Sequence, residues 1–268
     1  MEIHARGFGE ILTVGMGYLG KVWRKLIPPS FGAFVVLGAA TILIFRATGA
    51  NEVLDLIFTN PEALETMTDE EILEFGGQIF QAIAWAVVLQ LIASGYVALA
   101  VHRLVAAEIA GNPISAGEAA RFAFTRLAPL LVAGSIGAIG IFFGLLFLIV
   151  PGVWLAGSLA MTAPAMAIEG LGPTDALRRS YHLVRGRWFP TVGFMLMVGL
   201  LGMVAGQFVQ LVGVPLFTVG SLGIGLGLAF VLSVVIQGFI VAAIAVMGTA
   251  WYVDLRARKE TLLSESLG

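Results

Sequence analysis

Residues 127–168 contain no charged side chain and read LAPLLVAGSIGAIGIFFGLLFLIVPGVWLAGSLAMTAPAMAI. A helix needs roughly 20 apolar residues to cross the hydrocarbon core of a bilayer, so this stretch is long enough for two crossings. Pro151 and Gly152 interrupt it near the middle, where they favour a tight turn. The stretch therefore predicts two membrane-spanning helices joined at Pro151 and Gly152.

The composition of the whole chain agrees with a membrane protein. Of its 268 residues 59% are hydrophobic and 12% are charged, and the mean hydropathy is +0.96. Soluble domains are typically about 45–50% apolar and about 25% charged, which excludes a soluble globular domain. The formal net charge of −2 provides no basic surface for nucleic acid, so we expect no nucleic-acid partner. The absence of cysteine removes disulfides, thiolate catalysis and zinc–thiolate sites.

Three further uncharged stretches complete the set of expected spans. They cover residues 26–45, 75–101 and 188–253, and the last is interrupted around Pro215 and Gly220, so that it holds two spans. The sequence thus predicts an all-α bundle of six transmembrane helices in a single membrane domain, residues 1–268. Residues 47–75 form an acidic outer loop, and residues 254–268 form a short cytoplasmic tail.

The basic residues fix the expected orientation, because cytoplasmic loops carry the excess of Lys and Arg. With six spans, 14 of the 15 basic residues fall on one side of the membrane and only Arg46 falls on the other. We therefore expect a multi-pass protein of the cell (cytoplasmic) membrane with both termini in the cytoplasm. The inner side then carries 14 basic and 9 acidic residues, and the outer side one basic and 8 acidic residues.

A recurring pattern divides the chain into three similar units, approximately residues 8–101, 114–168 and 173–253. Each unit has a segment of helical periodicity, then a basic residue followed three positions later by proline, and then the uncharged stretch. The three prolines are Pro28, Pro129 and Pro190. We expect three parallel hairpin repeats, each preceded by a cytoplasmic amphipathic helix that lies in the membrane interface. The alternative is that a basic residue near a proline is common where a helix enters the membrane, and that the three instances are coincidental.

The basic side chains of these interfacial segments are the expected contacts for anionic lipid headgroups. They are Lys21, Arg24, Lys25, Arg121, Arg126, Arg178, Arg179, Arg185 and Arg187.

One part of the chain resembles a known group of proteins. The residues concerned are Pro151-Gly152-Val153-Trp154, Ala163-Pro164-Ala165, Glu169-Gly170, Ala176-Leu177-Arg178-Arg179-Ser180, Leu183, Gly186 and Trp188. They resemble the membrane domain attached to some glycerophosphoryl diester phosphodiesterases and related stand-alone six-span prokaryotic membrane proteins. The resemblance implies six spans with cytoplasmic amphipathic helices and an association with glycerophospholipid metabolism. It implies no enzymatic activity, because in the fused proteins the hydrolase is a separate soluble barrel.

Glu169 ends the fourth expected span at the cytoplasmic face, just before a segment that contains Arg178 and Arg179. We expect a structural ion pair, with Arg179 as the preferred partner, that holds this segment against the bundle. The alternative is a catalytic base with Ser180 or His182 as its partner, but no nucleophile, metal set or oxyanion feature accompanies it.

Three glutamines mark the polar positions of the last two spans. Gln207 and Gln210 are three residues apart on one helix face and, together with Gln237, are a candidate polar pathway. The alternative, which we favour, is hydrogen bonding between helices of the bundle.

The outer loop is acidic and contains no basic residue after Arg46. A cation site is one interpretation, but Asn60-Pro61-Glu62 and Thr68-Asp69-Glu70-Glu71 both resemble helix starts, in which acids favour the helix dipole. We expect short helices here and neither a metal nor a cofactor.

These observations predict a non-enzymatic membrane accessory or scaffold protein that binds anionic lipid at the cytoplasmic leaflet. The alternative is a transporter or channel for a lipid or small solute, with its pathway between the repeats.

Overall fold

The computed structural model describes the backbone of residues 7–60, 62, 66–218 and 222–267, and their side chains except at 54–55, 58–59, 208–218, 222–232, 234–235 and 261–267. The helices of this part are α1 (Phe8–Ala47), α2 (Ala50–Thr59), α3 (Asp69–Ile109), α4 (Ala116–Phe147), α5 (Ile149–Ser158), α6 (Thr162–Glu169), α7 (Pro173–Val184), α8 (Trp188–Thr218) and α9 (Leu222–Leu267).

Six helical segments of the described chain are long and apolar enough to cross a membrane, as expected from the sequence. They are Phe8–Ala47, Asp69–Ile109, Ala116–Phe147, Ile149–Glu169, Trp188–Gln207 and Ile236–Glu260.

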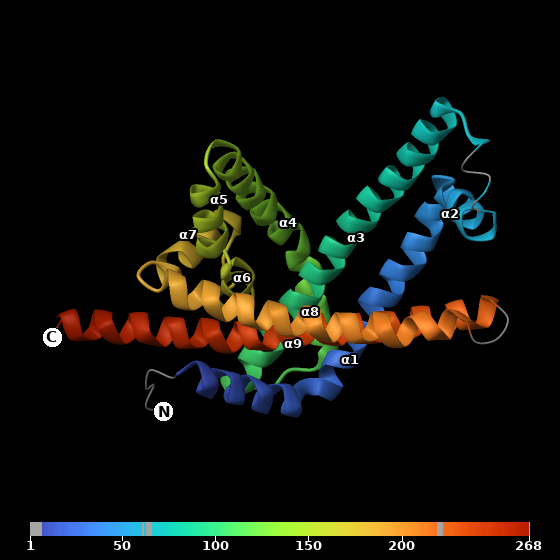
Figure 1. Cartoon of the computed structure of the whole chain (residues 1–268). Helices are drawn as coiled ribbons and strands as arrows, with labels where there is room; N and C mark the ends of the chain where they lie inside the picture. The colour runs from blue at the N-terminus through green and yellow to red at the C-terminus, as the bar shows by residue number, and fades with distance from the viewer. Residues whose placement is uncertain (1–6, 61, 63–65, 219–221, 268) are drawn as a thin grey trace.

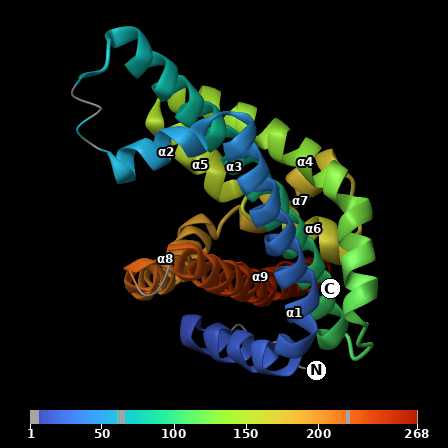
Figure 2. The same ribbon diagram turned by 90° about the vertical axis from the view of Figure 1, so that its right-hand side faces the viewer.

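Three pairs of helices diverge from a common base (Figures 1 and 2). α1 and α3 lie side by side and carry α2 at their far end, α4 packs along α5, and α8 packs along α9. The start of α1 and the C-terminal end of α9 lie at the same end of the molecule. The base is the region where α9 meets α1, α3, α6 and α7, so segments distant in sequence contact one another there.

α9 is the central helix of this base and contacts α1, α3, α6, α7 and α8. In the apolar stretch that lies within Ile236–Glu260 of α9, 61% of the residues are buried, against 22% and 11% in the corresponding stretches of α1 and α4. The exposed large apolar side chains of the other helices are mostly Leu, Ile, Val and Phe. Lipid tails are as apolar as these side chains, so their exposure within a bilayer carries no solvation penalty.

The three prolines of the recurring sequence pattern lie in different structural settings. Pro28 and Pro29 lie inside α1, and Pro129 lies inside α4, so in these two units the entry segment and the apolar segment form one continuous helix. Figure 1 shows a bend in α1, which we attribute to the hydrogen bonds that its two prolines remove. In the third unit the chain breaks between α7 and α8, where Gly186 has a φ of +86°.

The turn predicted at Pro151 and Gly152 lies three residues earlier. α4 ends at Phe147, Leu148 is extended, and Pro151 falls in the first turn of α5, where its missing N–H has no helical partner to lose. Gly152 of α5 instead lies in close contact with Gly144 of α4. A Cβ built on Gly144 would lie only 2.8 Å from the Gly152 Cα, so the two helices can approach this closely because Gly144 has no side chain. The Pro-Gly pair therefore packs α5 against α4.

The acidic loop is largely helical. It contains α2 and the first turns of α3, whose start at Thr68 is capped as predicted: the Glu71 N–H donates to the Thr68 Oγ1 at 3.4 Å. Asn60 ends α2, and the helix start predicted at Asn60-Pro61-Glu62 falls partly outside the described residues.

Candidate functional site

α7 is a short helix placed between two apolar segments, and its sequence explains its bounds. Pro173 occupies the first helical position, where its fixed φ suits a helix start, and Asp175 follows in the first turn. Ala176, Leu183 and Val184 are fully buried against the base of the bundle. Arg178, His182 and Arg185 are exposed. The helix thus presents an apolar side to the protein and a basic side outward.

Arg179 connects α7 to the end of α6. Its Nη2 and Nε donate hydrogen bonds to the Glu169 Oε1 at 2.8 Å and 3.0 Å. These are the two residues that the sequence pairs. Partial burial acts to lower the pKa of Arg179, but the hydrogen bond and the negative charge of Glu169 outweigh it and raise that pKa.

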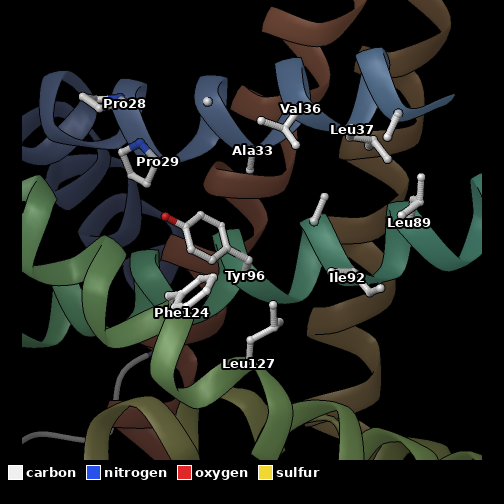
Figure 3. A pocket seen from close by; sticks show the side chains of 13 residues that line it. Pro28, Pro29, Ala33, Val36, Leu37, Leu89, Ile92, Tyr96, Phe124 and Leu127 are labelled. Atoms are coloured by element: carbon white, nitrogen blue, oxygen red, sulfur yellow. The ribbon is translucent and has the colours of Figure 1, made fainter. Parts of the chain in front are cut away.

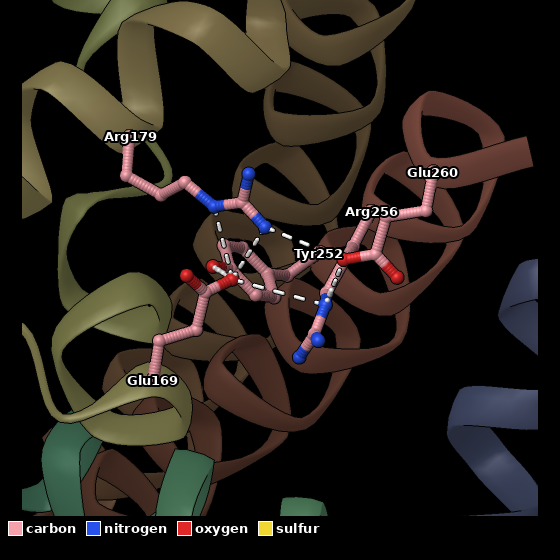
Figure 4. A network of polar contacts seen from close by, with 5 residues as sticks. All are labelled: Glu169, Arg179, Tyr252, Arg256 and Glu260. Atoms are coloured by element: carbon pink, nitrogen blue, oxygen red, sulfur yellow. Dashed lines mark hydrogen bonds and ion pairs between the residues drawn. The ribbon is translucent and has the colours of Figure 1, made fainter. Parts of the chain in front are cut away.

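Three residues of α9 complete a network around this pair (Figure 4). The Tyr252 hydroxyl donates to the Glu169 Oε1 at 2.6 Å. The Arg256 Nε lies 3.9 Å from the same oxygen and 2.6 Å from the Glu260 Oε1, and Glu260 is also 3.6 Å from the Arg179 Nη2. The two acids and two guanidiniums balance in charge. The network therefore joins α6, α7 and α9 at one point.

The residues of α9 were not predicted. The sequence treats residues 254–268 as a tail, whereas α9 continues without interruption to Leu267. Tyr252 is 83 residues from Glu169, and no local pattern links the two. Tyr252, Arg256 and Glu260 are spaced four residues apart and share one helix face. This spacing is the sequence pattern from which a polar face on α9 could have been predicted.

Ser180 makes a second connection, at a break in the fourth span. α5 ends at Ser158 and α6 begins at Thr162, so the break leaves backbone groups without helical partners. The Ser180 Oγ accepts from the Met161 N–H at 3.0 Å and donates to the Ser158 carbonyl at 2.8 Å. Ser180 is fully buried. One hydroxyl from α7 thus satisfies a donor and an acceptor, which hydrocarbon would otherwise penalise.

Most of the basic side chains expected to contact lipid have no acidic partner in the part of the chain that the structure describes. Of the nine, Arg179 pairs with Glu169, and the Lys25 Nζ lies 3.8 Å from the Glu108 Oε2. No carboxylate of the described residues lies within 4.0 Å of the basic groups of the other seven, Lys21, Arg24, Arg121, Arg126, Arg178, Arg185 and Arg187. Several lie over aromatic rings instead, such as Arg24 over Trp23 at 5.2 Å.

Of the three glutamines proposed as a polar pathway, the structure describes the side chains of two. Gln207 and Gln237 are both exposed, and the side chain of Gln210 lies outside the described residues.

The described residues contain no group of three or more His, Asp or Glu that could hold a metal ion. His102 is 4% exposed, and its Nδ1 lies 2.8 Å from the Thr249 Oγ1. The Thr249 hydroxyl donates to the Ala245 carbonyl, so the His102 Nδ1 acts as the donor in this contact. His102 therefore ties α3 to α9.

The six segments of the described chain that are long and apolar enough to cross a membrane define the class of multi-pass helical membrane proteins. Within this class the chain belongs to the family described as Domain of unknown function (DUF7847), whose profile matches residues 78–255. The matched region includes α4 to α7 and the network residues Glu169, Arg179 and Tyr252. No curated protein and no solved structure matches the chain.

Proposed function

We propose that this protein is a non-enzymatic membrane accessory or scaffold protein that binds anionic lipid at the cytoplasmic leaflet. The observation that carries the proposal is the set of seven basic side chains without an acidic partner among the described residues. Such side chains attract lipid phosphates, at about 1 kcal/mol for each Lys or Arg near an anionic surface.

α7 is the strongest element of this proposal. The Glu169 network and the Ser180 bonds fix its apolar side, while Arg178 and Arg185 stay exposed on the other. A helix held in this way keeps its basic side outward without a conformational change. It supports the expected interfacial position of the amphipathic segment that precedes the third expected hairpin.

The lipid class that we propose is glycerophospholipid. The sequence resemblance to the membrane domain of glycerophosphoryl diester phosphodiesterases supports it, and the phosphate of these lipids suits unpaired guanidiniums. Gln207 and Gln237 are both exposed, so they lend no support to the alternative of a transporter or channel with a polar interior.

Native mass spectrometry of the purified protein tests the proposal. The variant replaces Arg178, Arg185 and Arg187 with Gln and leaves Arg179 unchanged, because Arg179 belongs to the network. We expect weaker retention of phosphatidylglycerol, by about a hundredfold if each of the three lost contacts contributes about 1 kcal/mol. The matched control is Arg46→Gln, which alters an exposed basic residue on the expected outer side. Equal retention by the triple variant and the wild type would refute the proposal.

A further inference from the structure

An apolar groove lies between α1, α3 and α4 (Figure 3). Its volume is about 370 Å³, which is within the range of small-ligand sites. α1 lines it from Pro28 to Ala40, and α3 lines it from Leu89 to Tyr96. Twelve residues of helix rise about 18 Å, and half of the hydrocarbon core is about 15 Å thick. The groove therefore has the length of one bilayer leaflet.

Tyr96 is the only one of the 13 lining residues whose side chain carries a polar atom. In Figure 3 its hydroxyl points toward the end of the groove formed by Pro28 and Pro29. Among the described residues nothing forms a hydrogen bond with this hydroxyl. A half-buried phenol in an apolar groove needs a polar partner, because an unsatisfied hydroxyl is costly in hydrocarbon.

Each of the three helices that line the groove has a basic residue beyond the end at which Pro28 and Pro29 lie. Lys25, whose Nζ lies 3.8 Å from the Glu108 Oε2, precedes Pro28 by one turn on α1. Arg121 precedes Phe124 by one turn on α4. Arg103 follows Tyr96 by seven residues, or two turns, on the same face of α3. Its guanidinium lies 5.1 Å from the Phe122 ring centroid, and no carboxylate of the described residues lies within 4.0 Å of it.

We infer that this groove binds one acyl chain of an anionic phospholipid of the cytoplasmic leaflet. The chain lies along Gly32 and Val36, the Tyr96 hydroxyl donates to an ester oxygen, and the phosphate contacts Arg103. An apolar channel beside one hydroxyl and a basic rim matches the order of groups along a phospholipid. This inference rests on the proposed function and assigns it a specific site, which includes Arg103, a residue absent from the lipid contacts predicted from the sequence.

Filling the groove is the direct test. Gly32 has no atom within 4 Å of a Cβ built on it, so Gly32→Phe places a ring in the groove without a backbone clash. Gly134 of α4 is likewise exposed with open space around it and does not line the groove, so Gly134→Phe is the matched control. The measurement is native mass spectrometry of delipidated protein titrated with phosphatidylglycerol or phosphatidylcholine.

We expect Gly32→Phe to lower the affinity of the tightest phosphatidylglycerol site by about tenfold, because filling the groove removes the apolar contacts of the lipid. Gly134→Phe should leave this affinity unchanged. Arg103→Gln should weaken phosphatidylglycerol and spare phosphatidylcholine. Equal binding by Gly32→Phe and the wild type would overturn the inference. Loss of binding in the Arg178, Arg185 and Arg187 variant alone would overturn the groove and leave the proposed function standing. Loss of binding in Gly32→Phe alone would leave the groove standing and would overturn the role that the proposed function gives to α7.

A second measurement covers the case in which Gly32→Phe does not fold. The chain has no cysteine, so Val36→Cys and Leu196→Cys each accept one fluorescent label. Both positions are exposed, 69% at Val36 and 62% at Leu196, but only Val36 lines the groove. A brominated phosphatidylglycerol should quench the label at Val36 at a lower mole fraction in vesicles. Quenching of both labels at the same mole fraction would contradict a groove site.

Discussion

Tyr252 of α9 donates a 2.6 Å hydrogen bond to the same oxygen of Glu169 that accepts from Arg179 of α7. One carboxylate oxygen thereby receives donors from two helices that are distant in sequence. The Glu169 side chain is 17% exposed, so much of its interaction with water is replaced by these donors. The contact fixes the position of α7, and with it the direction of the basic side of that helix.

Replacing Glu169 with Gln should destabilise the protein by about 1–3 kcal/mol, because Arg179 and Arg256 lose their shared anion. Thermal unfolding in detergent, followed by circular dichroism, measures the change as a lower Tm. Glu260→Gln is the control: its side chain is 52% exposed, and an exposed ion pair contributes about 0–1 kcal/mol. Equal losses in the two variants would mean that Glu169 has no special place in the network.

Tyr252→Phe removes a hydroxyl and leaves the ring. We expect a loss of about 1–3 kcal/mol, since a hydrogen bond to a charged group is broken while Glu169 stays partly buried. Tyr18→Phe removes a hydroxyl for which the described residues provide no hydrogen-bond partner, so its Tm should change little. An unchanged Tm for Tyr252→Phe would show that α9 does not hold Glu169 through this bond.

Ser180→Ala leaves the Met161 N–H and the Ser158 carbonyl without partners at the break between α5 and α6. We expect a loss of about 1–3 kcal/mol and faster amide hydrogen exchange at residues 159–161. Thr125→Ala removes an exposed hydroxyl that donates to the Phe122 carbonyl, and it should cost less than about 0.5 kcal/mol. Unchanged exchange in the Ser180 variant would exclude the proposed role of its hydroxyl.

Gly144→Ala should push α4 away from α5, because the added Cβ would lie 2.8 Å from the Gly152 Cα and 2.9 Å from its nitrogen. Backbone atoms cannot move aside as a flexible side chain does, so we expect a loss of about 1–3 kcal/mol. Gly134→Ala on the same helix has open space around it and should be neutral or slightly stabilising. An unchanged stability of Gly144→Ala would mean that α4 and α5 are not packed closely enough for the added Cβ to meet the Gly152 backbone.

The six spans could be predicted because hydrocarbon imposes a length and an apolar composition on each one. The pairing of Glu169 with Arg179 was also predicted, since the two residues are ten positions apart around a short turn. Tyr252 and Ser180 could not be found in this way, because their partners depend on how distant helices pack. The turn at Leu148 was missed because Pro151 is equally suited to a turn and to the first turn of a helix.

The side of the membrane on which α7 lies decides whether its basic residues can meet the cytoplasmic leaflet. The chain has no cysteine, so Arg178→Cys and Arg46→Cys each provide a single exposed thiol. A membrane-impermeant maleimide should label Arg46→Cys in intact cells, and it should label Arg178→Cys only after permeabilisation. Labelling of Arg178→Cys in intact cells would contradict a lipid-binding face in the cytoplasm.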